Sequence, residues 1–343
     1  MNLNRHLKLG PLVIAGALAL LFASGCAEVP PAPPKPAPVW PPAPAQPAVM
    51  YERDISAPGD IGVQPSVFSR MADWITGIGK VKGKLVNPFG LALDDAGDLL
   101  VTDTGANAVC LLDLTHQKWL RWEAVAKVRF QSPVAVARHG DTFFVADSAL
   151  GKVIAFDAKG KLQFEITNGL VRPSGLALLG DRLYVADAGQ HQVGIFDVTG
   201  KFIAKFGQRG DGPGEFNFPT HISTDAAGLV YVTDSLNCRI EVFSADGKFL
   251  RAFGSTGDGP GRFSRPKGVA VDPAGHIYVV DAVFDNVQVF DGQGRLLMDW
   301  GQTGQGAGEF WLPNAIVISR DNVIYVADSF NHRIQVFRYI RTP

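Results

Sequence analysis

The chain has few cysteines, no excess of either charge, and an N-terminal apolar run that is too short to cross a membrane. Three cysteines in 343 residues exclude a disulfide-dense scaffold. The 32 basic and 33 acidic side chains nearly cancel, which argues against a general nucleic-acid binder, because such proteins normally have a strong basic excess. The apolar run covers residues 12–22, whereas a membrane-spanning helix needs about 20 apolar residues.

The remaining composition is that of a globular, turn-rich protein. The chain is 46% hydrophobic and 19% charged, so it is able to bury a substantial core. Its 38 glycines and 23 prolines indicate many turns, as an all-β protein requires.

The N-terminus has the features of an export signal. Arg5 and Lys8 precede the apolar run, which ends in the sequence ASGC at 23–26. This ending resembles a bacterial lipobox, and the resemblance implies cleavage before Cys26 and attachment of lipid to it. An ordinary secretory signal with an incidental cysteine is the alternative. We therefore expect a signal peptide at 1–25 and a lipid-anchored protein of the cell envelope.

Residues 26–66 are expected to form a spacer between the lipid and the folded domain. Up to residue 50 the segment is rich in Pro and Ala, a composition that cannot bury a core and favours extended polyproline II. A proline-rich ligand for a partner is the alternative. Ala27 stands where an Asp is associated with retention in the inner membrane. In a host with two membranes, we therefore expect the outer membrane, with the protein facing the periplasm.

One unit repeats through the rest of the chain. The sequence IYVADSFNHRIQVF at 324–337 has five earlier relatives, each with an Asp at the same place. These aspartates are Asp103, Asp147, Asp187, Asp234, Asp281 and Asp328, at intervals of 44, 40, 47, 47 and 47 residues. Intervals of this length are typical of propeller blades.

Each period contains signals for four short strands. A Pro opens an apolar strand, the Asp ends a second, and a third and usually a fourth follow after Gly-, Asp- and Asn-containing turns. The opening prolines are Pro88, Pro133, Pro173, Pro219, Pro266 and Pro313. Four strands per period predict an all-β, six-bladed β-propeller with four-stranded antiparallel blades.

The motifs resemble those of the NHL-repeat β-propellers. The residues that match are the Pro-x-Gly strand opening, the Tyr-Val-Ala-Asp strand, the turn after it and the Gly-rich link at 207–216, which recurs at 254–263 and 301–310. The resemblance implies that residues 67–343 form the propeller. G-x-G strings in these links are read as connectors between blades, because they do not open a helix after a strand.

The last repeat ends after its third strand, so the ring needs a strand from elsewhere. Residues 71–75 (MADWI) parallel 297–301 (LMDWG), and their distance to the next opening Pro is similar. We therefore predict that 71–75 is the N-terminal strand that completes the sixth blade and covers its edge.

The sequence contains no complete catalytic or metal-binding set. Some similar propellers, the peptidylglycine amidating lyases, hold zinc with three channel histidines, but only His221 stands at an innermost strand here. The channel residues of calcium-dependent lactonases are also missing. The repeated aspartates are interpreted as turn residues that bind backbone N–H groups. His221 is predicted either to contact a ligand or to make a structural hydrogen bond.

A partner-binding face is predicted where the turns after the aspartates meet the links between blades. Leu236, Phe284 and Phe330 occupy these turns, and Trp311 belongs to the last link. Arg239 and Arg333, together with Arg172, Arg265 and Lys267, are expected to form a basic fringe. Aromatic residues and Arg are favoured at interface centres. Packing of these side chains onto adjacent blades is the alternative.

The sequence therefore favours a non-enzymatic, membrane-tethered binding or scaffold lipoprotein that docks a protein or peptide. A metal-dependent lyase or lactonase acting in the central channel is the alternative. RNA binding is a third, against which export and the near-neutral charge both argue. We expect no cofactor and no metal.

Overall fold

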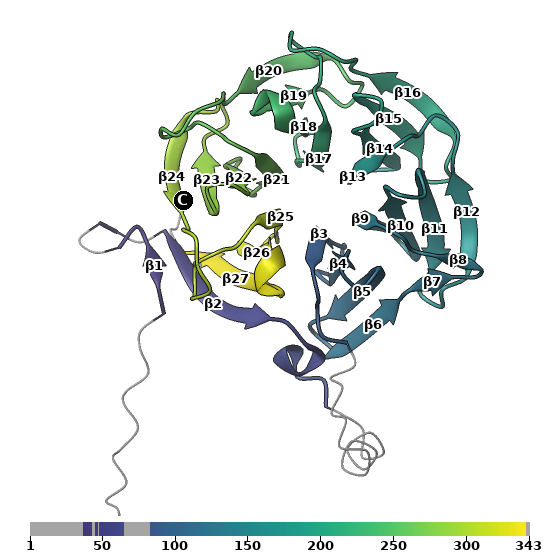
Figure 1. The fold of residues 1–343 in the computed structure, drawn as a ribbon, viewed down its shortest axis with the longest axis horizontal. Helices are drawn as coiled ribbons and strands as arrows, with labels where there is room; N and C mark the ends of the chain where they lie inside the picture. Colours follow the sequence, from purple (N-terminus) through teal and green to yellow (C-terminus); the bar gives the residue numbers. More distant parts are fainter. Residues whose placement is uncertain (1–36, 43–44, 47, 65–82, 341–343) are drawn as a thin grey trace, which may run out of the picture. The chain divides into compact units, whose positions relative to one another are not determined.

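The computed structural model describes residues 37–42, 45–46, 48–64 and 83–340, so the predicted signal peptide and Cys26 lie outside the described residues. Six antiparallel sheets stand around a common axis, each with the strand that opens its repeat innermost (Figure 1). This is the predicted all-β, six-bladed propeller. None of the helices in the described ranges is long and apolar enough to span a membrane.

The strands follow one another from the axis outwards within each blade. Blade 1 consists of β3 (Pro88–Leu93), β4 (Leu99–Asp103), β5 (Ala108–Asp113) and β6 (Lys118–Trp122). Blade 2 consists of β9 (Pro133–His139), β10 (Thr142–Asp147), β11 (Lys152–Asp157) and β12 (Leu162–Ile166). Blade 3 consists of β13 (Pro173–Leu179), β14 (Arg182–Asp187), β15 (Gln192–Asp197) and β16 (Phe202–Phe206).

Blades 4 to 6 repeat this order. Blade 4 consists of β17 (Pro219–Thr224), β18 (Val230–Asp234), β19 (Arg239–Phe243) and β20 (Phe249–Phe253). Blade 5 consists of β21 (Pro266–Val271), β22 (Ile277–Asp281), β23 (Asn286–Phe290) and β24 (Leu296–Trp300). Blade 6 begins with β25 (Pro313–Ile318), β26 (Val323–Asp328) and β27 (Arg333–Tyr339). Short elements in the connections are β7 (Ala124–Val125), β8 (Val128–Arg129), and the 3₁₀ helices η1 (Pro58–Ile61), η2 (Ser235–Asn237) and η3 (Ser329–Asn331).

The predicted start of the first strand and the predicted end of the second strand are confirmed in all six blades. Every innermost strand begins at the predicted Pro, and every second strand ends at the predicted Asp. The second strands are buried apart from Thr142 and Arg182, the first residues of β10 and β14, whereas the outer strands β20 and β24 alternate between more exposed and more buried residues. This alternation follows from the period of two in a strand with one face on the core.

The repeated aspartates attach each incoming link to its own blade. All six are fully buried. Asp103 accepts hydrogen bonds from the backbone N–H groups of Val86 and Asn87, each at 2.9 Å, and Asp328 accepts one from Trp311 at 2.8 Å. A buried carboxylate is tolerated when such donors satisfy it. These contacts confirm that the aspartates are structural turn residues.

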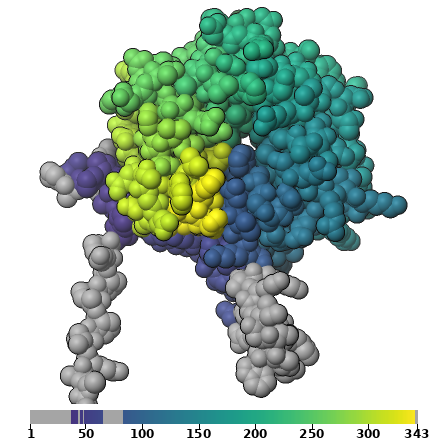
Figure 2. Space-filling model, in the orientation of Figure 1, coloured from purple at the N-terminus to yellow at the C-terminus, as the bar shows by residue number. Residues whose placement is uncertain are grey.

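The sixth blade is closed by strand β2 (Val49–Ile55), so the prediction that residues 71–75 form this strand was wrong. β2 runs antiparallel to β27, with Val49 opposite Tyr339 and Ile55 opposite Ile334. The purple N-terminal strand accordingly lies along the yellow C-terminal blade (Figure 1, Figure 2). Strand β1 (Val39–Trp40) pairs with the outer side of β2.

An N-terminal strand thus completes the last blade, as predicted, but it comes from residues 26–66, which the composition had indicated as a spacer. Val49 and Ile55 are fully buried, and the Tyr51 ring packs edge-on against Phe337 with centroids 5.8 Å apart. These side chains cover the core that β27 leaves open. Residues 71–75 lie outside the described residues.

Trp40 packs against blade 6 at the place where blade 5 uses its own outer strand. Gly261 and Gly308 hold the same position in the links before blades 5 and 6. A Cβ atom added at Gly261 would lie 3.7 Å from Leu296 of β24, whereas one added at Gly308, where φ is +76°, would lie 2.1 Å from the Trp40 ring. Only glycine fits under the indole. Trp40 therefore anchors the N-terminal segment to blade 6.

Candidate functional site

The central channel is narrowed at its waist by side chains from three blades. His221 of β17 stacks with Phe89 of β3 on the opposite side of the ring, with ring centroids 6.5 Å apart. The side-chain amide of Asn314, on β25, donates to the Phe89 carbonyl at 3.1 Å and lies 3.3 Å from His221 Nε2. Side chains fill much of the circle that the ribbons leave open (Figure 2). His221 lines a cavity on each side of this waist.

The cavity of about 320 Å³ opens on the face that carries the turns after the aspartates. We call it the mouth cavity. Its lining comes from positions that flank the opening prolines and from the turns after three of the aspartates, and includes Phe89, Arg172, Ser174, Phe218, Thr220, His221, Leu236, Arg265 and Lys267. The second cavity, of about 280 Å³, lies among the later residues of the innermost strands.

The mouth cavity is positively charged. Arg172, Arg265 and Lys267 line it, and no acidic residue does so among the described residues. Burial, together with the charges of Arg265 and Arg172, lowers the pKa of Lys267 to about 8. Burial, and then the charge of Lys267, lower the pKa of His221 to about 3, so its imidazole is neutral at physiological pH.

The neutral His221 has one nitrogen without a partner. Because the Asn314 Nδ2 group is only a donor, the His221 Nε2 atom accepts and the proton resides on Nδ1. This Nδ1 atom is buried and has no hydrogen-bond partner, and the same holds for the hydroxyl of Thr220. Two of the residues that line the mouth cavity therefore carry a buried polar atom without a partner.

Five large apolar side chains are exposed on the turns after the aspartates and on the last link, and we call them the apolar rim. They are Leu236, Val283, Trp311, Leu312 and Phe330. Trp311 and Phe330 are 45% and 47% exposed although their rings contact each other, with centroids 5.9 Å apart. Leu236 belongs both to the rim and to the lining of the cavity.

Three of the residues predicted for a partner-binding face are exposed on this rim, namely Leu236, Trp311 and Phe330. Phe284 is only partly exposed, and its neighbour Val283 is exposed in its place. The binding role of these residues stays a prediction.

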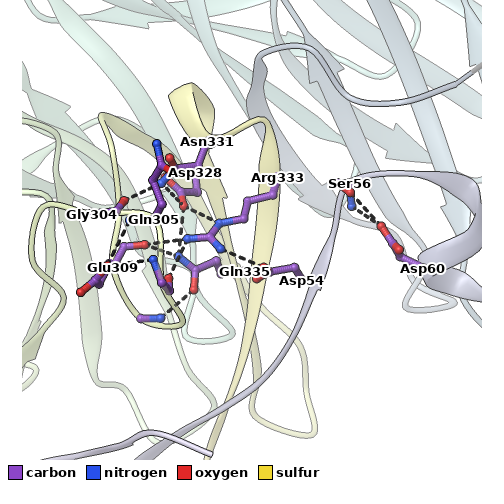
Figure 3. A network of polar contacts seen from close by, with 12 residues as sticks. Asp54, Ser56, Asp60, Gly304, Gln305, Glu309, Asp328, Asn331, Arg333 and Gln335 are labelled. Carbon is purple, nitrogen blue, oxygen red and sulfur yellow. Dashed lines mark hydrogen bonds and ion pairs between the residues drawn. The ribbon is translucent and has the colours of Figure 1, made fainter. Parts of the chain in front are cut away.

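Arg333 is held inside the structure and does not contribute to a basic fringe. Its Nε donates to Asp328 at 2.8 Å, and Nη1 donates to Asp54 of β2, also at 2.8 Å (Figure 3). Its Nη2 donates to the carbonyl groups of Gly306 and Glu309. Arg333 thus joins the closing strand to the blade and to the link before it.

Arg239 is engaged in the same way in blade 4. It donates to Asp234 at 2.9 Å and to the carbonyl groups of Asp211, Gly212 and Glu215. Each arginine thus pairs with the aspartate five residues before it, so neither belongs to the predicted basic fringe. Of the basic residues predicted for the fringe, Arg172, Arg265 and Lys267 remain, and these line the mouth cavity.

The channel residues do not fit a three-histidine zinc site. His221 is accompanied at the waist by an amide and an aromatic ring, neither of which replaces a His or carboxylate ligand. Within the described ranges, no three His, Cys, Asp or Glu side chains gather closely enough to hold a metal ion.

A ring of six four-stranded blades around a narrowed channel defines a six-bladed β-propeller. A family model described as a 6-bladed beta-propeller matches residues 167–230, 224–283 and 273–339, which together are just over half of the chain. The chain belongs to this family.

One curated relative is a probable peptidyl-alpha-hydroxyglycine alpha-amidating lyase from Caenorhabditis elegans, 33% identical over 92 residues. The match covers 24% of this chain and 26% of that protein, so the chain spans about a quarter of the relative's length.

Two solved structures show similarity of fold. Virginiamycin B lyase from Staphylococcus aureus has a TM-score of 0.54 and 15% identity, covering 74% of this chain and 95% of that one. An auxiliary nutrient binding protein from Bacteroides thetaiotaomicron has a TM-score of 0.60 and 14% identity, covering 75% and 70%.

Sequence reasoning missed the mouth cavity, although it named several of its residues. Arg172 and Arg265 directly precede an opening Pro, and Thr220 and Lys267 directly follow one. Their positions beside the opening prolines are the signal that could have predicted the cavity, because the innermost strands of a propeller converge on one axis. That convergence becomes visible only when the blades are assembled.

Proposed function

We propose that this chain is a binding protein of the cell envelope, tethered by lipid at Cys26, which docks a protein or peptide through the apolar rim. The main support is the exposed pair of aromatic rings, Trp311 and Phe330, which come from the link and the turn of blade 6. Large apolar side chains exposed together on one face are typical of interfaces.

The positive charge of the mouth cavity favours a negatively charged partner at this docking surface. Arg172, Arg265 and Lys267 lie beside the rim without an acidic neighbour in the cavity. Complementary charge steers association and selects partners. The proposed partner therefore presents an apolar segment together with negative charge.

Replacing Leu236, Trp311 and Phe330 together by Ser is expected to reduce partner binding roughly 100-fold or more, because aromatic anchors at interfaces often contribute about 2 kcal/mol each. The measurement is cross-linking of the full-length chain to its partner in intact cells, followed by titration of that partner against purified protein. The melting temperature should change little, since all three side chains are exposed.

A matched control replaces Ile203, Leu250 and Leu297 by Ser. These residues are 46%, 45% and 52% exposed and lie on the outer strands β16, β20 and β24. The control substitutions remove a similar amount of exposed apolar surface, but at a distance from the rim. Equal loss of binding in both triple variants, or no loss in either, contradicts the proposal.

A lyase acting in the channel is the second candidate. It is favoured by the name of the Caenorhabditis elegans relative and by His221, whose Nδ1 atom lacks a partner at the channel waist. Such an enzyme is expected to retain a divalent metal in near-stoichiometric amount after purification. We expect metal analysis of the full-length chain to find none, and stoichiometric zinc or calcium would favour the lyase.

A further inference from the structure

Five of the described side chains that line the mouth cavity carry donors with no acceptor within the protein. Among the described residues, no carboxylate forms an ion pair with Arg172, Arg265 or Lys267, and their side chains make no hydrogen bond. The Thr220 hydroxyl and His221 Nδ1 are buried without partners. Arg172 and Arg265 are exposed and Lys267 is half-buried, so an acceptor that enters the cavity is able to pair with all three cations.

The other hydroxyl groups of the cavity are already occupied. Ser148, Ser174 and Ser235 each donate to the carbonyl of the Pro that opens the next blade, at 2.5, 2.8 and 2.8 Å. They connect neighbouring blades at the axis. The free donors are therefore confined to the three cations and to Thr220 and His221.

The three cations also repel one another. The positive charges of Arg265 and Arg172 act on Lys267 and favour its neutral form. An anion placed among the three groups opposes this repulsion and favours the charged form of Lys267. A cluster of like charges in a cavity, with a perturbed pKa in one member, is typical of a binding site.

We propose that the mouth cavity binds an organic carboxylate, whose carboxylate group lies among Arg172, Arg265 and Lys267 and whose apolar part contacts Phe89, Phe218 and Leu236. This inference goes beyond the proposed function, because a small carboxylate can occupy the cavity whether or not a protein docks on the rim. The same chemistry accommodates the end of a peptide chain or an acidic side chain.

The lining favours an organic carboxylate over free phosphate. Inorganic phosphate would satisfy the donors but would leave the aromatic and aliphatic walls of the cavity without contact. A volume of about 320 Å³ accommodates a small organic molecule. A carboxylate attached to an apolar group satisfies both parts of the lining, since guanidinium groups bind carboxylates with two parallel hydrogen bonds.

The test uses calorimetric titration of the purified full-length chain with N-acetylphenylalanine, with N-acetylphenylalanine amide and with inorganic phosphate. We expect the free acid to bind and the amide to bind at least roughly tenfold more weakly, because a hydrogen bond to a charged group contributes about 1.5–3 kcal/mol. Arg265→Gln and Arg172→Gln are each expected to weaken binding of the acid by a similar factor.

Lys267→Met separates binding from folding. It removes one cation from the repelling set, so the melting temperature should rise while the acid binds more weakly. Arg320→Gln is the matched control, because Arg320 is 91% exposed and lies on the turn between β25 and β26, outside the mouth cavity. It should leave binding unchanged.

Three outcomes overturn the proposal. The first is absence of binding by the acid at millimolar concentration, and the second is equal binding of acid and amide. The third is binding of phosphate at least as tight as that of the acid, which would assign the cavity to a free inorganic anion. All three outcomes are measured on chains in which the rim is intact, because Leu236 belongs both to the rim and to the cavity.

Discussion

The double substitution Val49→Asp and Ile55→Asp is expected to abolish cooperative folding of the whole ring. Both side chains are fully buried in the core of blade 6, on the strand that closes the propeller. An uncompensated buried charge costs about 3–5 kcal/mol, so two of them approach the total stability of about 5–15 kcal/mol that a typical domain has. Release of β2 would also expose the edge of β27 to aggregation.

The measurement is thermal unfolding followed by circular dichroism, together with size-exclusion chromatography. Arg53→Asp is the control, because Arg53 is exposed on the same strand and its replacement should change stability by no more than about 0.5 kcal/mol. If the double variant melts like the unsubstituted chain, β2 does not close the ring and another segment takes that role.

Glu241→Gln is expected to stabilise the protein at pH 8 by about 1–3 kcal/mol. Glu241 is fully buried, its Oε1 atom lies 2.9 Å from Arg239 Nη2, and the Gly214 N–H approaches its carboxylate without a well-aligned hydrogen bond. Burial is the main cause that raises the pKa of Glu241 to about 7, against the opposing charge of Arg239. The carboxylate therefore ionises at a cost to the folded state.

The next two blades show what a neutral amide does at this position. Gln335 accepts from the Gly308 N–H at 2.8 Å and donates to the Glu309 carbonyl at 2.5 Å. Gln288 accepts from the Gly261 N–H at 3.1 Å and donates likewise to a carbonyl of the link before its blade. A Gln at 241 is expected to make the same pair of bonds.

The stabilisation by Glu241→Gln should be larger at high pH than at low pH. Because its pKa is higher in the folded than in the unfolded state, Glu241 favours folding when protonated, and this contribution is lost as the pH rises from about 4.5 to about 7. Glu241→Gln should therefore raise the melting temperature by several degrees at pH 8 and much less at pH 5.

Gln288→Glu is the matched reverse substitution in blade 5 and should lower the melting temperature at pH 8. Calorimetric melts at both pH values measure the two variants. A stabilisation by Glu241→Gln that is equal at pH 5 and pH 8, or a destabilisation at pH 8, would indicate that the ion pair with Arg239 outweighs the burial of the charge.

Local sequence determined most of the fold. The opening prolines and the terminal aspartates marked the ends of twelve strands, because each acts through its own backbone or through a link close to it in the chain. The alternation of apolar residues determined which face of the outer strands β20 and β24 is buried. The number of copies determined the number of blades.

The closing strand could not be predicted from a local motif. Residues 71–75 resemble an outer strand, but pairing with β27 depends on which distant segment also covers Phe337 and Gly308. Tyr51 and Trp40 do so, and their sequence context is rich in proline and polar residues. Long-range pairing of this kind depends on the assembled edge.

The sequence by itself determined that this protein is a six-bladed propeller, since the repeat period, the prolines and aspartates at strand ends and the turns after the aspartates are all local properties. Only the tertiary structure decided which residues are available for binding. In it, the Arg239 and Arg333 side chains lie within the blades, where they donate to aspartates and carbonyl groups. It also brought Arg172, Arg265 and Lys267 together in one cavity, because residues far apart in the chain meet only where the innermost strands converge on the axis.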